Sequence, residues 1–134
     1  MNSKKAAKQN FYYTHDHEWI DFQGSVAYIG VCSFKLKGIK QIQKIMFSEN
    51  SGLIRQGALI ATIQYDDYLV NVNMPVEGKI LSINDMLLTD EQNILLKHPE
   101  SKGWIALIFP RQIQERNNLL PPEEYEHLQK IQMK

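Results

Sequence analysis

The sequence predicts a mainly β fold, a sandwich or barrel that carries short helices and one helix near its carboxyl end. Three observations predict it. Several short segments have apolar residues at strand spacing, turn-forming residues separate them, and one late segment has the signals of a helix start. The 134 residues suit about one domain, and the apolar content is that of a soluble globular protein.

The amino-terminal part predicts a tail followed by strands. Residues 1–10 have neither the apolar core of a signal peptide nor an arginine-rich transit pattern, so we expect a disordered tail before a single domain at 11–134. Residues 11–22 are rich in aromatic side chains without helical spacing, which predicts an extended segment and then a strand. The strand expected at 25–31 has two fairly apolar faces, which favours a central place in its sheet.

A short helical turn and an ambiguous segment come next. We expect Ser33 to cap a turn at residues 34–37, which Gly38 ends. Residues 42–47 have apolar spacings that suit either a helix or a strand. We favour the strand, because strand-like segments surround it on both sides.

The middle of the chain, residues 59–83, predicts a hairpin and a third strand. One strand leads to a tight polar turn at 65–68, and a return strand leads through a second turn at 75–78 into the next strand. On the return strand Val70, Val72 and Met74 alternate with a second set of residues, so one face should pack and the other should meet water.

The carboxyl-terminal part predicts one more strand and a helix. A polar loop or short helical turn is expected at 85–92, and the last strand at 104–109, stopped by Pro110. A helix at about 121–132 begins with two prolines and then two glutamates, which suit a helix amino terminus. Its apolar stripe is narrow, so we expect it on the surface of the domain.

Composition excludes several classes of function. Fifteen basic and fifteen acidic residues cancel, so we expect no nucleic-acid partner, and no apolar run approaches the roughly 20 residues that cross a bilayer, so we expect no membrane partner. The single cysteine, Cys32, excludes an internal disulfide and suits a reducing cytoplasm. We therefore expect a cytoplasmic protein. Neither a phosphate-binding glycine loop nor a nucleophile elbow occurs, so we also expect that the protein is not an enzyme.

Two groups of residues are candidates for chemistry outside the hairpin. His15 and His17 would share a face if they lay on a strand, which leaves a metal-binding protein as one alternative. We favour packing or surface roles for both, because the sequence does not point to third and fourth ligands. Cys32 precedes the short helical turn, where a thiolate would be favoured, but no base is evident, so we favour a packed thiol.

The hairpin tip places two carboxylates between two tyrosines. Asp66 and Asp67 could form an acid-base pair or bind a cation, but a tip that projects into water lacks the walled pocket that shifts a pKa. We therefore expect no catalytic residues and interpret the tip as solvated turn residues or a recognition surface, since exposed tyrosines are frequent anchors. That surface comprises Gln64, Tyr65, Asp66, Asp67 and Tyr68.

From about Tyr12 to about Lys130 the chain carries short motifs whose order and spacing match a known family. They are His17-Glu18-Trp19, the glycine Gly57 before the hairpin, the turn Pro75-Val76-Glu77-Gly78, Asn84, Gly103-Trp104 and Glu124-Tyr125. By these motifs the chain resembles the H protein family of the glycine cleavage system, small carriers with a lipoyl-domain fold. The resemblance implies a lipoyl-domain-like flattened barrel, a barrel-sandwich hybrid.

The resemblance also implies where a cofactor would be attached. In that family the hairpin carries ESVKA, whose lysine is amidated by lipoic acid. Residues 57–75 can be laid on the family pattern without a gap, which puts Asp67 at the lysine position. No lysine occurs between Lys44 and Lys79, and a carboxylate offers neither the nucleophile nor the long arm. Lipoate is expected for the family but no cofactor is expected here, and Lys79 is the nearest substitute along the sequence.

The resemblance without the lysine implies a non-enzymatic binding module. We expect a decoy or regulator that docks on lipoyl-system proteins: glycine decarboxylase, aminomethyltransferase, dihydrolipoyl dehydrogenase or lipoate ligase-like proteins. One alternative is a working lipoyl or aminomethyl carrier that is modified at another lysine. The other is the metal-binding protein that uses His15 and His17.

Overall fold

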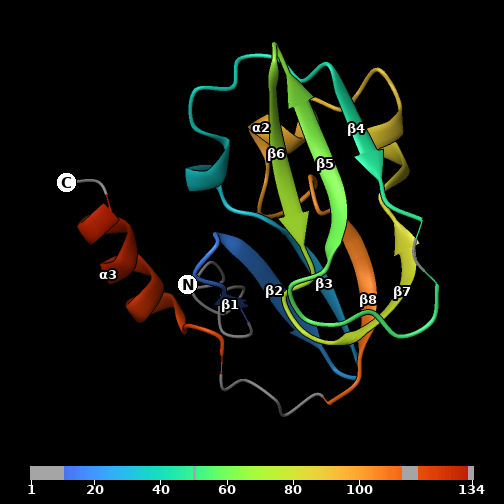
Figure 1. The fold of residues 1–134 in the computed structure, drawn as a ribbon. Helices are drawn as coiled ribbons and strands as arrows, with labels where there is room; N and C mark the ends of the chain where they lie inside the picture. The colour runs from blue at the N-terminus through green and yellow to red at the C-terminus, as the bar shows by residue number, and fades with distance from the viewer. Residues whose placement is uncertain (1–10, 50, 113–117, 133–134) are drawn as a thin grey trace, which may run out of the picture.

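Two antiparallel sheets form the fold (Figure 1). The computed structural model describes residues 11–49, 51–112 and 118–132, so the tail expected at 1–10 lies outside the described residues. The strands are β1 (Phe11–Tyr13), β2 (Glu18–Gln23), β3 (Val26–Val31), β4 (Lys44–Phe47), β5 (Leu59–Tyr65), β6 (Tyr68–Asn73), β7 (Gly78–Ile83) and β8 (Ala106–Pro110). One sheet has the order β1-β2-β3-β8-β7 and the other the order β4-β5-β6.

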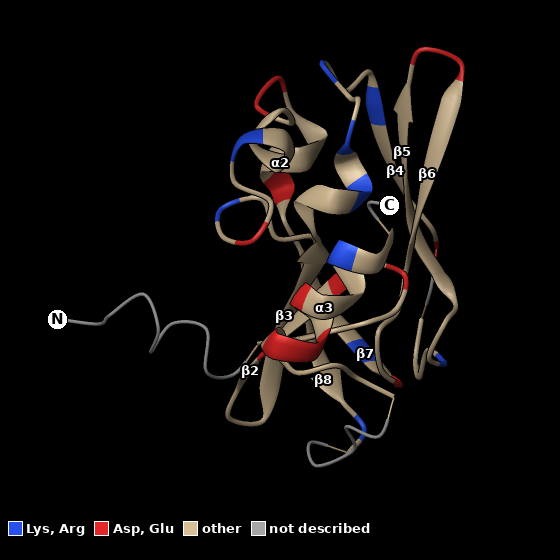
Figure 2. Ribbon diagram, turned by 90° about the vertical axis from the view of Figure 1, so that its left-hand side faces the viewer, with Lys and Arg blue, Asp and Glu red and all other residues tan. Residues whose placement is uncertain are grey.

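The two sheets lie side by side as layers, the three-stranded sheet on the right of Figure 2. The main core joins them and contains Ile29 and Ile108 from the larger sheet and Ile63 and Val72 from the smaller one. Each side chain of this kind stabilises the fold by about 1.5–3 kcal/mol when it is fully buried. β3 pairs with β2 and with β8, which confirms the central place predicted for residues 25–31.

Short helical elements lie between the strands and one longer helix follows the last strand; the sequence predicts all of them except the helix at 94–97. They are the 3₁₀ turns η1 (Ser33–Leu36) and η2 (Asp85–Leu88) and the helices α2 (Ile94–Lys97) and α3 (Pro122–Gln132). The prediction that Ser33 caps the first turn is wrong: Ser33 is the first residue of η1, and Cys32 before it makes no side-chain capping bond. Gly38 follows the turn with a φ of 85°, in the left-handed region that glycine adopts without strain.

Residues 44–47 of the ambiguous segment at 42–47 form a strand, and the last strand runs over 106–110 instead of the predicted 104–109. β4 pairs with β5, which confirms the strand that the neighbouring segments favoured. Pro110 is the last residue of β8, opposite Gly78, instead of stopping the strand before it. The missing N–H of Pro110 is tolerated because this residue lies at the end of the strand. The next residue, Arg111, donates its N–H to Glu77 O at 2.8 Å.

A second cluster covers the outer side of the larger sheet. Tyr125 of α3 stacks on Tyr13 of β1, with ring centroids 4.3 Å apart and planes within 6°. Phe11, Trp19 and Cys32 complete this cluster. α3 therefore lies on the outside of the domain, attached by one aromatic face, which confirms the surface helix that its narrow apolar stripe predicted.

Candidate functional site

The β5–β6 hairpin ends in a two-residue turn, Asp66-Asp67, between the paired residues Tyr65 and Tyr68. Asp66 has a φ of 50°, a left-handed conformation that aspartate tolerates better than most residues. Both aspartates are exposed, and Figure 2 shows the acidic turn at the free end of the hairpin. The turn thus presents two carboxylates to solvent.

Apolar side chains lie directly beside these carboxylates. The rings of Tyr65 and Tyr68 are 5.5 Å apart at 31°, and Tyr68 is 63% exposed. Leu69, the next residue of β6, is 62% exposed. We call residues 64–69 the tip surface. Residues 64–68 of this surface were predicted from the sequence, and Leu69 was missed. An apolar residue on the water-facing side of the return strand could have indicated it.

The base of the hairpin is attached to the larger sheet by a buried carboxylate. Glu18 Oε2 accepts a hydrogen bond from Asn73 N at 2.7 Å and from Lys35 Nζ at 3.0 Å. Glu18 Oε1 accepts from Thr14 Oγ1 at 3.2 Å. Asp16 Oδ2 accepts from the same Lys35 Nζ at 2.8 Å and from Asn73 Nδ2 at 3.1 Å. We call Asp16, Glu18, Lys35 and Asn73 the hairpin clamp.

The clamp carries a charge pair away from water. The side chains of Glu18 and Lys35 are 4% and 11% exposed. Burial raises the pKa of Glu18 above its usual value, and the positive charge of Lys35 and the Asn73 N–H oppose that shift without cancelling it. The clamp thus fixes the end of β6 at an electrostatic cost, as buried ion pairs commonly do.

The two histidines do not share a strand face. His17 lies in the turn between β1 and β2 with a φ of 66°, and its Nδ1 shares a hydrogen bond of 2.8 Å with the Tyr125 hydroxyl. Its ring stacks on Phe34 at 4.2 Å, and burial lowers its pKa. His15 is exposed. Within residues 11–49, 51–112 and 118–132, no three histidine, cysteine or acidic side chains come together as a group that could hold a metal ion.

Trp19 and Cys32 have packing roles. Trp19 Nε1 donates to Pro99 O at 3.0 Å, and its ring covers Gly30, where an added Cβ would lie 2.6 Å from it. His17, Glu18 and Trp19 therefore each make at least one long-range contact that holds the fold together. The Cys32 thiol is fully buried in the aromatic cluster of α3, which agrees with a packed thiol.

The lysines closest to the tip surface in sequence differ in their distance from it in space. Lys79 is the second residue of β7 in the larger sheet, opposite Phe109. Lys79 comes after the end of β6 in the chain. That strand has six residues, so its end lies about 20 Å from the tip. Lys44 is exposed on β4 directly opposite Gln64, two residues before Asp66. Lys44, on the neighbouring strand, is therefore closer to the tip than Lys79.

A flattened sandwich of two antiparallel sheets with a projecting hairpin places the chain in the class of lipoyl-domain-like proteins. More particularly, the chain belongs to the glycine cleavage H-protein family, whose profile, described as "Glycine cleavage H-protein", matches residues 11–132. Members of this family are lipoyl carriers and not enzymes themselves, which confirms the prediction that the chain is not an enzyme. The family resemblance and the barrel-sandwich fold are confirmed as well.

Individual relatives agree with the family assignment. The probable glycine cleavage system H protein of Aeropyrum pernix is 28% identical over 118 residues, 88% of this chain and 82% of that protein. The glycine cleavage system H protein of Halothermothrix orenii is 29% identical over 117 residues, 87% of this chain and 91% of that protein. The crystal structure of a glycine cleavage system H protein from Mycobacterium marinum superposes with a TM-score of 0.76 at 20% identity, covering 91% of this chain and 98% of that one. The described helices include none that is long and apolar enough to cross a membrane.

Proposed function

We propose that this protein is an H-protein-like module that carries no lipoyl group at its hairpin tip and binds proteins of a lipoyl system as a decoy or regulator. One observation carries the proposal: the tip of the β5–β6 hairpin presents Asp66 and Asp67 and no amine. The resemblance supports the proposal, because laying residues 57–75 on the family pattern without a gap would put Asp67 at the position of the modified lysine. The chain has a single cysteine, Cys32, and so forms no internal disulfide, which supports a cytoplasmic place for this role.

The tip residues do not fit lipoate. Lipoate joins a protein through an amide bond, and the bond needs a lysine amine as nucleophile. Asp67 supplies an acceptor-only carboxylate on a side chain of one methylene, which is too short to move a group between two active sites. The tip surface therefore serves contact with a partner and not the transport of a group.

The chemistry of the tip surface describes the partner surface that it fits. Tyr68 and Leu69 offer apolar area that a partner pocket would bury, and Asp66 and Asp67 would meet basic side chains at its rim. The proposed partners are proteins that receive an H protein or another lipoyl domain: glycine decarboxylase, aminomethyltransferase, dihydrolipoyl dehydrogenase or a lipoate ligase-like protein.

Intact mass spectrometry tests whether the protein accepts a lipoyl group. The purified protein is incubated with lipoate, ATP and a lipoate ligase, and we expect its mass to stay unchanged. The matched variant Asp67→Lys restores an amine at the tip and should gain one lipoyl group if the ligase recognises the surrounding hairpin. A lipoyl group on the unaltered chain would overturn the proposal. An unmodified variant would show that the divergence from the family extends beyond one residue.

A binding assay tests whether the tip surface contacts the proposed lipoyl-system partners. Each proposed partner is immobilised and the chain is tested at equilibrium, together with a Tyr68→Ser, Leu69→Ser double variant. We expect the double variant to weaken binding by about tenfold or more, because it removes both apolar anchors. Leu81→Ser is the matched control, since Leu81 is similarly exposed at 52% but lies on β7. Failure of the chain to bind any of the partners would remove the idea.

A second function is favoured by the position of Lys44. A carrier modified at another lysine needs an exposed amine near the recognised hairpin. Lys44 lies on β4 opposite Gln64 of the tip surface, whereas Lys79 lies in the other sheet. Peptide mapping after the ligase reaction separates the two residues. Lipoate on Lys44, lost in Lys44→Arg and kept in Lys79→Arg, would replace the decoy with a carrier. Unmodified Lys44 and Lys79 peptides would exclude a carrier that uses either residue.

A further inference from the structure

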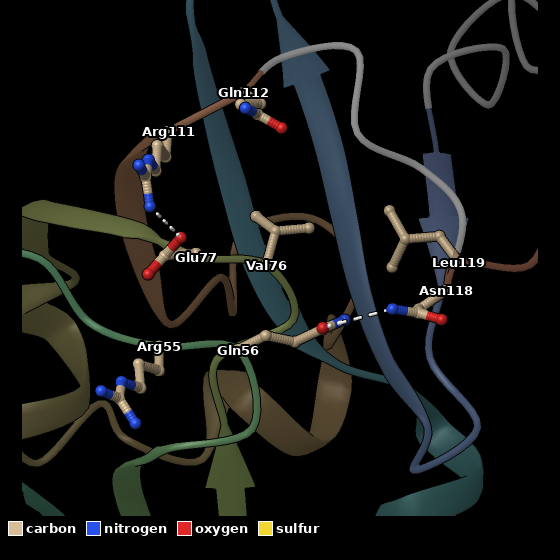
Figure 3. Close-up of a pocket in the computed structure, with 8 residues that line it drawn as sticks. All are labelled: Arg55, Gln56, Val76, Glu77, Arg111, Gln112, Asn118 and Leu119. Atoms are coloured by element: carbon tan, nitrogen blue, oxygen red, sulfur yellow. Dashed lines mark hydrogen bonds and ion pairs between the residues drawn. The ribbon is translucent and has the colours of Figure 1, made fainter.

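A pocket of about 580 Å³ opens at the base of the β5–β6 hairpin, at the other end of the strands from the tip. Four segments line it: the residues before β5, the turn between β6 and β7, the residues after β8, and the residues before α3. Figure 3 shows Arg55, Glu77 and Arg111 on one side of the pocket and Asn118 and Leu119 on the other. Its volume lies in the range of small-molecule sites, about 300–1,000 Å³.

The walls of the pocket are held by backbone hydrogen bonds. Ile54 and Gly78 exchange two of them, with N–O distances of 2.8 and 3.0 Å, and Arg111 N donates to Glu77 O at 2.8 Å. The strands approach so closely there that a Cβ on Gly78 would lie 2.6 Å from Phe109 O. The pocket is therefore formed before any ligand arrives, which lowers the entropic cost of binding.

The polar groups inside the pocket are oriented by one another. Gln56 Nε2 donates to Pro75 O at 3.1 Å, and Asn118 Nδ2 donates to Gln56 Oε1 at 3.4 Å. Each of the two side-chain amides keeps further donor and acceptor capacity for a ligand. Arg111 Nη1 donates to Glu77 Oε1 at 3.0 Å, so its charge is already compensated (Figure 3).

Arg55 is the charged residue of the described lining whose side chain has no ion-pair partner. Among the described residues its side chain makes no ion pair and no hydrogen bond, whereas Arg111 pairs with Glu77, so the described lining has one uncompensated positive charge. A guanidinium binds a carboxylate through two parallel N–H···O bonds. A single cation matches the single charge of a carboxylate better than the double charge of a phosphate.

We propose that this pocket binds an extended polar ligand through one carboxylate, which Arg55 holds, while the side-chain amides of Gln56 and Asn118, which Figure 3 shows on the side away from the Arg55 guanidinium, bind polar groups farther along the ligand. The apolar lining, Val76 and Leu119, is almost fully buried, so little apolar surface is left for a lipid tail. A free small acid and the carboxyl terminus of a peptide share this chemistry. The pocket lies away from the tip surface, and the proposal does not depend on the function assigned to the tip.

Titration followed by ¹H–¹⁵N NMR tests the proposal on the full chain. The probes are acetate, N-acetylalanine and a tripeptide with a free carboxyl terminus, each compared with its neutral amide. We expect saturable shifts of the backbone amides of Gln56, Glu77 and Arg111 with the acids and not with the amides. Saturation by acetate identifies a free small acid, and saturation by the tripeptide alone identifies a chain terminus.

Two variants make the test specific. Arg55→Gln should weaken binding of the acids by about tenfold or more, since it removes the charge-assisted hydrogen bonds. Lys79→Gln is the matched control, because it removes a surface charge outside the lining and should leave binding unchanged. The absence of saturable shifts at tens of millimolar acid would overturn the proposal. Equal affinities of Arg55→Gln and the unaltered chain would overturn it as well.

Discussion

Replacing Glu18 with alanine should measure how strongly the hairpin clamp holds β6. The change leaves the Lys35 ammonium, 11% exposed, and the Asn73 N–H without the acceptor that lies 3.0 and 2.7 Å away. Removing one partner of a buried ion pair costs about 3–5 kcal/mol. Asp16 still binds Lys35 at 2.8 Å, but its side chain is 60% exposed and solvent screens that pair, so it recovers only a small part of the cost.

We therefore expect Glu18→Ala to lower the free energy of unfolding by about 3 kcal/mol and the melting temperature by roughly 10 °C. Urea unfolding followed by tryptophan fluorescence measures this directly. Asp16→Ala is the control and should cost about 1 kcal/mol or less. The double variant Glu18→Gln, Lys35→Met should regain most of the loss, because glutamine keeps an acceptor for Asn73 N and no buried charge remains.

Two results would refute this reasoning. A loss below about 1 kcal/mol in Glu18→Ala would show that the carboxylate does not fix the end of β6. Equal losses in Glu18→Ala and Asp16→Ala would show that burial of the carboxylate does not set its contribution. Either result would also remove the clamp as the feature that orients the hairpin.

The remaining predictions concern pH and packing. The pKa of Glu18 is raised above 4.5, so its protonation favours the folded state: that contribution is present below pH 4.5 and is lost as the pH rises through the folded-state pKa. Glu18→Gln should remove this loss, so unfolding free energies measured from pH 4.5 upward should fall less than in the unaltered chain; parallel curves would contradict the shift. Gly30→Ala should cost about 2 kcal/mol in urea unfolding, because its Cβ would lie 2.6 Å from the buried Trp19 ring, and a neutral effect would show that the ring moves aside.

Much of the fold could be predicted because its signals are local. Alternation of Val70, Val72 and Met74 is set by the period of a strand, and Pro122, the first residue of α3, suits the start of a helix. The cap expected at Ser33 failed because residue type alone does not locate the first residue of a 3₁₀ turn, where one residue decides which side chain reaches the free N–H groups.

The candidate sites were predicted in part for the same reason. The tip residues 64–68 were found because a hairpin turn is encoded in consecutive residues. Leu69 was missed because its place beside Tyr68 becomes important only when both are seen to be exposed. The pocket at Arg55 could not be predicted, since its lining comes from segments that are up to about 60 residues apart in the chain.

The hairpin and its two aspartates were determined by the sequence alone, because consecutive residues encode the strand, the polar turn and the return strand. The absence of a lysine between Lys44 and Lys79 was determined there too. Only the tertiary structure decided that Lys44 is closer than Lys79 to the tip, because strand register sets distances that chain separation does not. It likewise decided that Glu18 holds the base of the hairpin, because that carboxylate meets Lys35 and Asn73 only when the two sheets pack together.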